Sequence, residues 1–290
     1  MQIGFNAPTT GALIEPDSLR RIITEGEALG FDYATVSDHI MVPRNLESKY
    51  PYTDSGEFPA GTAAAWLEQL TTTAYTAALT SKLRFVMSVM VVPHRPAVLT
   101  AKILATIDYL SSGRLTLGIG VGWCREEFAL MGEQFDARGK RTDEIIDLMR
   151  QLWEPGWTEF DGEFYRAPRL EMQPTPPPIP IYVGGLSDAA LRRAARNDGW
   201  IGDLIKTDRA IEAVARLREL RAENGLSMDD FTILTPLTDA FTTADYQRAA
   251  DAGITGIITM PWMFYAGPDA SLDDKIDGMQ RFRKDLGLDG

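Results

Sequence analysis

The stretch of sequence that decides the fold runs from Val91 to Trp153. Its informative parts read VVPHRPAVLTAK (91–102), GRLTLGIGVGWCREEF (113–128) and RGKRTDEIIDLMRQLW (138–153). In chain order they predict the end of a strand, a helix, a second strand, a glycine-rich loop and another helix. Strands that alternate with helices in this way are typical of α/β proteins with a parallel sheet.

The same alternation extends from this stretch to both ends of the 290-residue chain. Short apolar segments predict strands at residues 2–5, 33–37, 83–91, 115–119, 179–183, 199–201, 231–237 and 256–260. Amphipathic segments predict helices at residues 16–29, 64–80, 97–110, 138–152, 187–196, 209–224, 244–252 and 272–286. Strands that are each followed by a helix predict an α/β fold, a single-domain (β/α)8 TIM barrel over residues 1–290. That fold needs about 250 residues.

A doubly wound sheet of the Rossmann type is the alternative architecture. Gly118, Gly120 and Gly122 follow a predicted strand, but their spacing is not the G-x-G-x-x-G of the dinucleotide-binding fingerprint. That fingerprint also normally opens its domain, whereas these glycines follow the fourth predicted strand. Both observations favour the barrel.

Two segments exceed what a minimal barrel needs. Residues 41–61 follow the second predicted strand and contain several prolines, glycines and aromatic residues. Because barrel chemistry occurs where the strands end, we expect this insert to act as a lid. Residues 157–168 read WTEFDGEFYRAP, and Asp161-Gly162 between two aromatic-rich arms predicts a β-hairpin.

Composition narrows the range of partners and locations. The net charge of −12 argues against nucleic acid and anionic membranes as partners. No apolar stretch approaches the roughly 20 residues that span a bilayer. Cys124 is the single cysteine, so disulfides within the chain are excluded and we expect a cytoplasmic protein. With only His39 and His94 as histidines, no metal site is expected.

Ser37-Asp38-His39 closes the second predicted strand. Active sites of barrels form at the C-terminal ends of the strands, and a histidine there can donate or accept a proton near neutral pH. His39 is therefore the candidate catalytic residue. The structural alternative is a histidine packed at the barrel rim.

Two glycine-containing segments are candidate ligand sites. Gly120 and Gly122 let a flat ligand approach the backbone closely, and Trp123 either stacks on that ligand or packs at the rim. Gly184-Gly185 precede a predicted helix, whose free N–H groups and positive dipole end can bind an anion. An ordinary strand-to-helix turn is the alternative.

Three further features complete the set of candidates. Glu126 and Glu127 are expected to be exposed in the first turn of a helix. Residues 261–265 (PWMFY) follow the eighth predicted strand, and their bulk suggests a substrate-pocket wall or a dimer surface. Cys124 is expected to be unreactive, because no nearby residue offers a base for nucleophilic catalysis.

The stretch from Val91 to Trp153, together with the S-D-H motif, resembles the luciferase-like oxidoreductases. These are barrel enzymes that hold a flavin or the deazaflavin coenzyme F420. The resemblance implies that His39 acts as an acid/base or supports the ring, that Asp38 acts beside it, and that a non-proline cis peptide joins Ser88 to Val89 against the ring. The residues that it places at the cofactor are Ser37, Asp38, Ser88, Val89, Gly120, Gly122, Trp123, Val183, Gly184, Gly185 and Leu186.

The resemblance also implies a function. The S-D-H motif and the glycine-rich run are more similar to the deazaflavin branch, which implies an F420-dependent oxidoreductase that transfers hydride to or from a small organic substrate. The alternatives are an FMN-dependent luciferase-like monooxygenase and a non-catalytic flavin-binding protein. Trp123 stands where the deazaflavin-dependent sugar-phosphate dehydrogenases have a glutamate, so that substrate class is not expected. Relatives are often homodimers, so a homodimer is expected.

Overall fold

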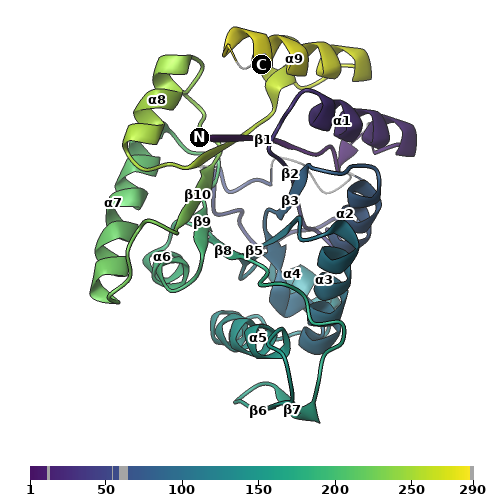
Figure 1. The fold of residues 1–290 in the computed structure, drawn as a ribbon, viewed down its shortest axis with the longest axis vertical. Helices are drawn as coiled ribbons and strands as arrows, with labels where there is room; N and C mark the ends of the chain where they lie inside the picture. Colours follow the sequence, from purple (N-terminus) through teal and green to yellow (C-terminus); the bar gives the residue numbers. More distant parts are fainter. Residues whose placement is uncertain (12–13, 54, 59–64, 288–290) are drawn as a thin grey trace.

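The computed structural model describes residues 1–11, 14–53, 55–58 and 65–287 (Figure 1). In this part of the chain, eight parallel strands close into a barrel through pairing of the first and last strands in the order β3-β2-β1-β11-β10-β9-β8-β5. The strands are β1 (Gln2–Asn6), β2 (Tyr33–Val36), β3 (Arg84–Met87), β5 (Leu115–Gly120), β8 (Ile181–Gly184), β9 (Gly199–Ile201), β10 (Thr232–Thr235) and β11 (Gly256–Thr259). The predicted (β/α)8 barrel is therefore confirmed.

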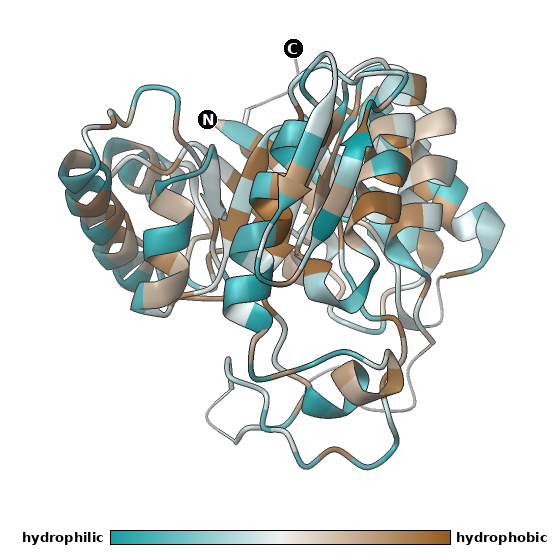
Figure 2. Cartoon of the chain, turned by 90° about the horizontal axis from the view of Figure 1, so that it is seen from below, coloured by the Kyte–Doolittle hydropathy of each residue, from teal (hydrophilic) through white to brown (hydrophobic). Residues whose placement is uncertain are grey.

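Helices form a ring outside the barrel (Figure 1). They are α1 (Pro16–Ala28), α2 (Gln69–Ala78), α3 (Ala97–Ser111), α5 (Arg138–Leu152), α6 (Asp188–Ala195), α7 (Thr207–Glu223), α8 (Thr243–Asp251) and α9 (Leu272–Asp285). Each carries both hydrophilic and hydrophobic bands (Figure 2), as helices do when one face packs on a sheet. None of the helices among the described residues is long and apolar enough to cross a bilayer.

Helix α2 begins later than the sequence predicts. Residue 64 lies outside the described residues, and Glu68 is the N-cap, whose side chain accepts a hydrogen bond from the Thr71 N–H. A carboxylate at this position satisfies one of the free N–H groups of the first turn. The amphipathic pattern alone did not locate this cap.

Large side chains fill the interior of the barrel. Tyr33 and Tyr182 are buried inside it, and a Cβ on Gly4 would lie only 2.1 Å from the Tyr33 ring. A Cβ on Gly199 would similarly lie 2.5 Å from the Tyr182 ring. The Tyr33 hydroxyl donates to the Ile257 carbonyl at 2.7 Å. The barrel interior is thus a packed core.

The third barrel strand is interrupted near its C-terminal end. One strand over 83–91 is predicted, but the chain forms β3 and a separate two-residue strand, β4 (Met90–Val91), both paired with β5. The peptide bond between Ser88 and Val89 is cis, as predicted. These two residues therefore lie between β3 and β4, at the mouth of the barrel.

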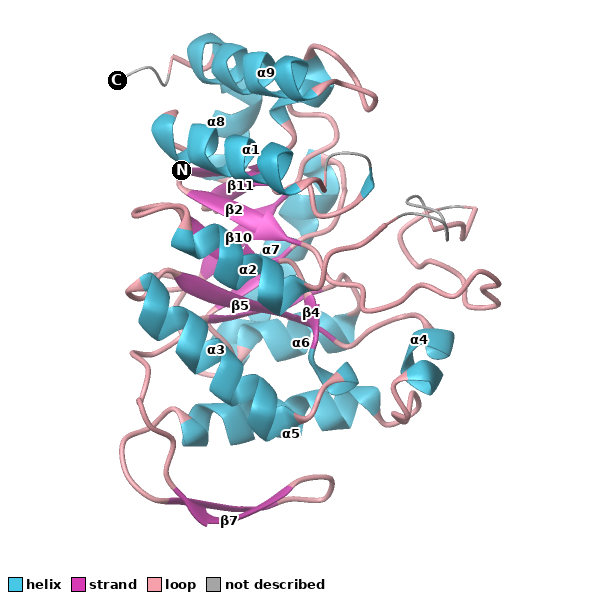
Figure 3. Ribbon diagram, turned by 90° about the vertical axis from the view of Figure 1, so that its right-hand side faces the viewer, coloured by secondary structure: helices cyan, strands magenta, loops and turns pink. Residues whose placement is uncertain are grey.

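The two inserts lie outside the barrel. Strands β6 (Thr158–Asp161) and β7 (Arg166–Leu170) form an antiparallel hairpin beyond α5 (Figure 1). The loop after β2 and the short helix α4 (Arg125–Leu130) lie together where the barrel strands end (Figure 3). Residues 54 and 59–61 of the predicted lid are outside the described residues.

Candidate active site

A cavity of about 770 Å³ opens at the C-terminal mouth of the barrel. This volume lies within the range of about 300–1,000 Å³ that small-molecule sites occupy. Nearly all of the predicted site residues line it: Ser37, Asp38, His39, Ser88, Val89, Gly120, Gly122, Trp123, Gly184, Gly185 and Leu186. The exception is Val183, which is buried in β8. The predicted site residues thus lie at the ends of separate strands but line one cavity.

The floor of the cavity is built around Val89. A Cβ on Gly120 would lie 2.6 Å from one Val89 methyl, and a Cβ on Gly184 would lie 2.8 Å from the other. Gly120 and Gly184 end two paired strands, β5 and β8. Their missing side chains therefore make room for Val89 and leave a smooth apolar floor.

His39 is held by a buried carboxylate. Its Nδ1 lies 3.1 Å from Glu127 Oε2, and the other Glu127 oxygen accepts from the N–H groups of Ile40 at 2.7 Å and Met41 at 3.2 Å. Burial opposes ionisation of Glu127, but hydrogen bonds from His39 and the Ile40 N–H outweigh it and lower its pKa. The Glu127 carboxylate therefore favours a proton on Nδ1, and no group among the described residues bonds Nε2.

This arrangement corrects the expectation for Glu127. The side chain is only 2% exposed, because the chain after β2 folds over it. Glu126 also accepts hydrogen bonds, from the Glu47 N–H at 2.6 Å and the Ser48 N–H at 2.9 Å. The pattern of a helix start predicted α4. It could not predict the contacts of Glu126 and Glu127, because their hydrogen-bond partners lie far away in the sequence.

Asp38 is a structural partner rather than a free carboxylate. Its oxygens accept two hydrogen bonds from the Arg95 guanidinium, at 2.8 and 2.7 Å, and one from the Val91 N–H at 2.9 Å. Arg95 also contacts Glu68 at 3.0 Å. The expected catalytic role does not fit this ion pair, because the carboxylate is already committed to a cation and a backbone donor.

Aromatic residues form the wall beside His39. Its ring centroid lies 4.7 Å from Trp66, 4.9 Å from Phe58 and 6.2 Å from Trp123. Tyr50 continues the wall, 5.2 Å from Trp123. The insert after β2 supplies Phe58 and Tyr50, so its aromatic composition was the signal that these residues face the site.

The other histidine is not available for proton transfer. His94 packs against Phe128, with ring centroids 4.3 Å apart. Burial lowers the pKa of His94 to about 4, so the ring is neutral at physiological pH. Burial likewise raises the pKa of Cys124 to about 11, which agrees with the expectation that this thiol is unreactive.

The opposite part of the cavity offers an anion site. Gly185 has φ +108°, a left-handed conformation that favours glycine, just before α6. Ser187 caps α6 by accepting from the Ala190 N–H. Arg138 lines the same cavity and uses its guanidinium on the carbonyls of Gly122 and Phe135, not on a carboxylate. Free helical N–H groups and an arginine without an acidic partner in the described part of the chain suit an anion.

Asp203 was not identified from the sequence. It follows β9, lines the cavity, and burial raises its pKa. Burial and the nearby Asp203 charge also raise the pKa of Tyr52 to about 12. The position after a strand was a usable signal, but an aspartate there is equally common in turns.

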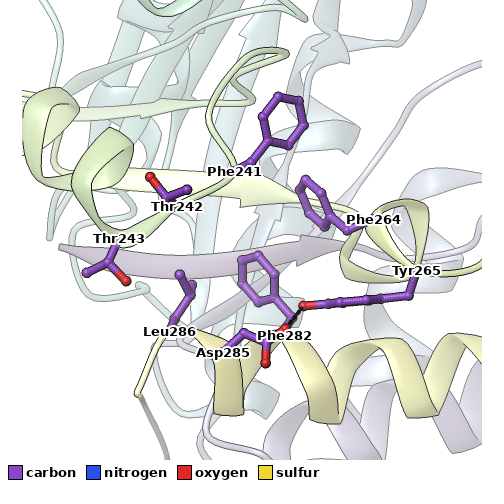
Figure 4. Close-up of a pocket in the computed structure, with 8 residues that line it drawn as sticks. All are labelled: Phe241, Thr242, Thr243, Phe264, Tyr265, Phe282, Asp285 and Leu286. Carbon is purple, nitrogen blue, oxygen red and sulfur yellow. Dashed lines mark hydrogen bonds between the residues drawn. The ribbon is translucent and has the colours of Figure 1, made fainter.

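Residues 261–265 do not line the mouth cavity. Pro261 and Trp262 are buried, and the 3-10 turn that they begin, η3 (Pro261–Phe264), packs along α9. Phe264 and Tyr265 instead border a separate hollow of about 400 Å³ between α8 and α9 (Figure 4). The Tyr265 hydroxyl donates to Asp285 there at 2.8 Å. Of the two alternatives for this segment, the wall of the mouth cavity is therefore wrong, and the dimer surface stays a prediction.

A barrel with an aromatic cavity at its mouth is the architecture of many enzymes, and comparison with known proteins identifies the class. The model of the luciferase-like monooxygenase family matches residues 1–281. The chain therefore belongs to this family of oxidoreductases and monooxygenases.

Two relatives and one structural neighbour illustrate what the chain is similar to. An uncharacterised protein of Mycobacterium tuberculosis is 39% identical over 268 residues, covering 90% of this chain and 91% of that protein. The FMNH(2)-dependent dimethylsulfone monooxygenase of Pseudomonas fluorescens is 34% identical over 63% of this chain and 47% of its own. The structure of the coenzyme F420 dependent tetrahydromethanopterin reductase from Methanopyrus kandleri has a TM-score of 0.74. It shares 16% identity and covers 99% of this chain and 98% of the other.

Proposed function

We propose that this protein is an F420-dependent oxidoreductase that transfers hydride between the deazaflavin and a small organic substrate. The observation that carries the proposal is the placement of the His39–Glu127 pair in the same cavity as the flat Val89 floor. An acid/base group beside a surface that fits a planar ring is what such a reaction requires of the protein.

The residues of the cavity fit a flat cofactor with a phosphate. Ser88 and Val89 would support the ring, because Gly120 and Gly184 leave the floor without projecting side chains. The N–H groups after Gly184-Gly185, with Leu186 and the Arg138 charge, would hold the phosphate. Trp123 would border the ring from the wall. When bound, the deazaflavin supplies the carbon that accepts or donates hydride.

The chain itself would control protons and water. Glu127 orients His39 so that Nε2 is the nitrogen left to hold or accept a proton beside the substrate. Asp38, held by Arg95, would anchor the chain just after Ser88-Val89 through the Val91 N–H. Phe58, Tyr50 and the other insert residues would cover the mouth and exclude water.

FMN-dependent monooxygenation is the second candidate, supported by the FMNH(2)-dependent relative. The test is titration of the purified protein with F420 and, separately, with FMN, followed by tryptophan fluorescence. We expect micromolar affinity for F420 and much weaker affinity for FMN. The reverse order would favour the monooxygenase, and binding of neither would contradict the whole assignment.

Two tryptophan variants locate the bound cofactor in this titration. Trp123→Phe should reduce the fluorescence change, because Trp123 lines the cavity, and Trp66, which lines it too, should account for the remainder. Trp157→Phe is the matched control, since Trp157 is 64% exposed and belongs to the hairpin region. Equal quenching in both variants would contradict binding at the mouth.

A non-catalytic flavin-binding protein is distinguished by His39. Under the proposed function, His39→Ala lowers turnover by about 10²–10⁴-fold, the usual contribution of one acid/base group. Cofactor affinity should change little. An unchanged rate with a confirmed substrate would refute the role of His39, and absence of any turnover in the wild type across substrates would favour the binding protein.

Assembly and location remain parts of the proposal. The expected homodimer is supported by exposed apolar side chains on α2 and α3, namely Tyr75, Val98, Leu99, Tyr109 and Leu110. Exposed apolar side chains on neighbouring helices are a feature of interfaces. The cytoplasmic location expected from the single cysteine stays a prediction.

A further inference from the structure

Asp203 faces the cavity from the side opposite His39. His39 follows β2 and Asp203 follows β9, and these strands are separated by four steps in either direction around the closed barrel. Both residues line the same cavity. A substrate that lies across the mouth can therefore meet the imidazole with one end and the Asp203 carboxylate with the other.

The carboxylates of the cavity differ in how far they are satisfied. Asp38 is bound by Arg95, and Glu127 accepts from His39 and two backbone N–H groups. Asp203, by contrast, accepts one hydrogen bond among the described residues, from the Leu204 N–H at 2.7 Å. No cation of the described chain forms an ion pair with it. A carboxylate can accept about four hydrogen bonds, so Asp203 has unused capacity.

Burial makes this unused capacity costly. Asp203 is partly buried, and its pKa is raised because burial disfavours the charged form. Tyr50 and Tyr52 of the insert lie close enough to be influenced by its charge. A ligand group that donates hydrogen bonds to Asp203 would offset the cost, whereas an anionic group would add repulsion.

We propose that Asp203 is a specificity determinant that binds a hydrogen-bond donor of the substrate, a hydroxyl or a protonated amine, and disfavours substrates that place a carboxylate or a phosphate against it. This inference rests on the proposed function for the reaction itself, but it concerns the recognition of the part of the substrate away from His39. It assigns the substrates to small alcohols and amines with an apolar body that fits the aromatic wall.

The test uses three probes with the same ring: cyclohexylamine, cyclohexanol and cyclohexanecarboxylate. Binding to the protein is measured by calorimetry at pH 7, with and without F420. We expect the amine to bind at least tenfold more tightly than the carboxylate, with the alcohol between them. Asp203→Asn should weaken the amine by about 10–100-fold, as expected for a lost hydrogen bond to a charged group, and should abolish the preference.

Controls keep the result decisive. Asp269→Asn removes an equal charge from an exposed position outside the cavity and should leave the preference unchanged. Asp203→Ser, which keeps an acceptor for the Leu204 N–H, gives the same loss if Asp203→Asn fails to fold. The proposal is overturned if the wild type shows no preference, including no binding of the amine, or if the Asp203 variants retain it. Because F420 affinity is measured separately, failure of the proposed function is distinguishable.

Discussion

Val89 shapes the cavity floor, because glycines on two paired strands make room for its side chain. Gly120→Ala places a Cβ 2.6 Å from a Val89 methyl, which should destabilise the protein by about 1–3 kcal/mol through overpacking. Val89→Ala removes that methyl. The double variant should therefore be less destabilised than the sum of the single variants, by about 0.5–3 kcal/mol. Urea unfolding of the four proteins measures this coupling.

A matched pair tests whether the coupling is specific. Gly139 lies in α5, and a Cβ there would lie 3.6 Å from Arg193, an ordinary contact. Gly139→Ala combined with Val89→Ala should be additive. Additivity in the Gly120 pair as well would contradict the packing of Val89 between the two strands.

Glu127 joins His39 to the start of the insert. Glu127→Gln leaves one oxygen to serve His39, Ile40 and Met41, because the amide nitrogen cannot accept a hydrogen bond. We expect the free energy of unfolding to fall by about 1–3 kcal/mol, the cost of an unsatisfied buried group. Glu154→Gln, at an exposed position, is the control for loss of charge. Equal stability of the two variants would mean that Glu127 is not buried as described.

The sequence indicated His39 but not Glu127, and the reason is physical. The pattern R-E-E-F at 125–128 describes a helix start, and such carboxylates usually face solvent. Glu127 is buried because residues 39–41 cover it, and no local periodicity reports a contact across 86–88 residues. Asp38 illustrates the converse: its motif marked the site, but only the structure revealed its Arg95 partner.

At the level of elements, α4 anchors the insert that lines the cavity. Hydrogen bonds from Ser48 and the Glu47 N–H overcome the effect of burial and lower the pKa of Glu126 from 4.5 to about 2. A lowered pKa means that the contribution to stability is complete above pH 4.5 and is lost as the pH falls toward 2. The insert should loosen from α4 over this range.

Hydrogen exchange checks this anchor without reaching acid pH. In Glu126→Gln at pH 7, the amides of Glu47 and Ser48 should exchange faster than in the wild type, because the charged acceptor is gone. Glu154→Gln should leave them unchanged. If the amides keep their protection in Glu126→Gln, the insert is held by other contacts, such as those of Tyr50 with Trp123.

The sequence predicts regular elements better than their interruptions. Short, nearly continuous apolar runs predicted the strands, because the parallel strands of a barrel are buried on both faces. The break between β3 and β4 was missed as a strand end, since a single serine in an apolar run does not predict one and only the family resemblance marked Ser88-Val89. In the hairpin, Gly162 was assigned to the turn, but a Cβ there would also lie 2.1 Å from Glu144 Oε1, which accepts from the Tyr165 N–H.

At the level of the whole molecule, the barrel followed from the strand–helix alternation, whereas its site required knowledge of which strands are neighbours. Asp203 shows this clearly. An aspartate that follows a short strand predicts no function by itself. Asp203 becomes a candidate site residue only because the closed order of strands places it across the mouth from His39. Conversely, the glycines of β5 and β8 could be predicted as site residues from the sequence, because glycine is the residue that lets a ligand approach the backbone.

The proposed homodimer gives a prediction on the same scale. Leu99 and Tyr109 are 56% and 60% exposed on α3, and further apolar side chains of α2 and α3 are exposed as well. We expect light scattering to give twice the chain mass of 32.1 kDa for the wild type. Leu99→Glu with Tyr109→Glu should shift the protein to the single-chain mass, because charges would be buried in the interface. Leu226→Glu, an exposed apolar position after α7, is the control that should remain dimeric. A wild-type mass of one chain, or a dimer that survives the α3 changes, would contradict an interface on this face.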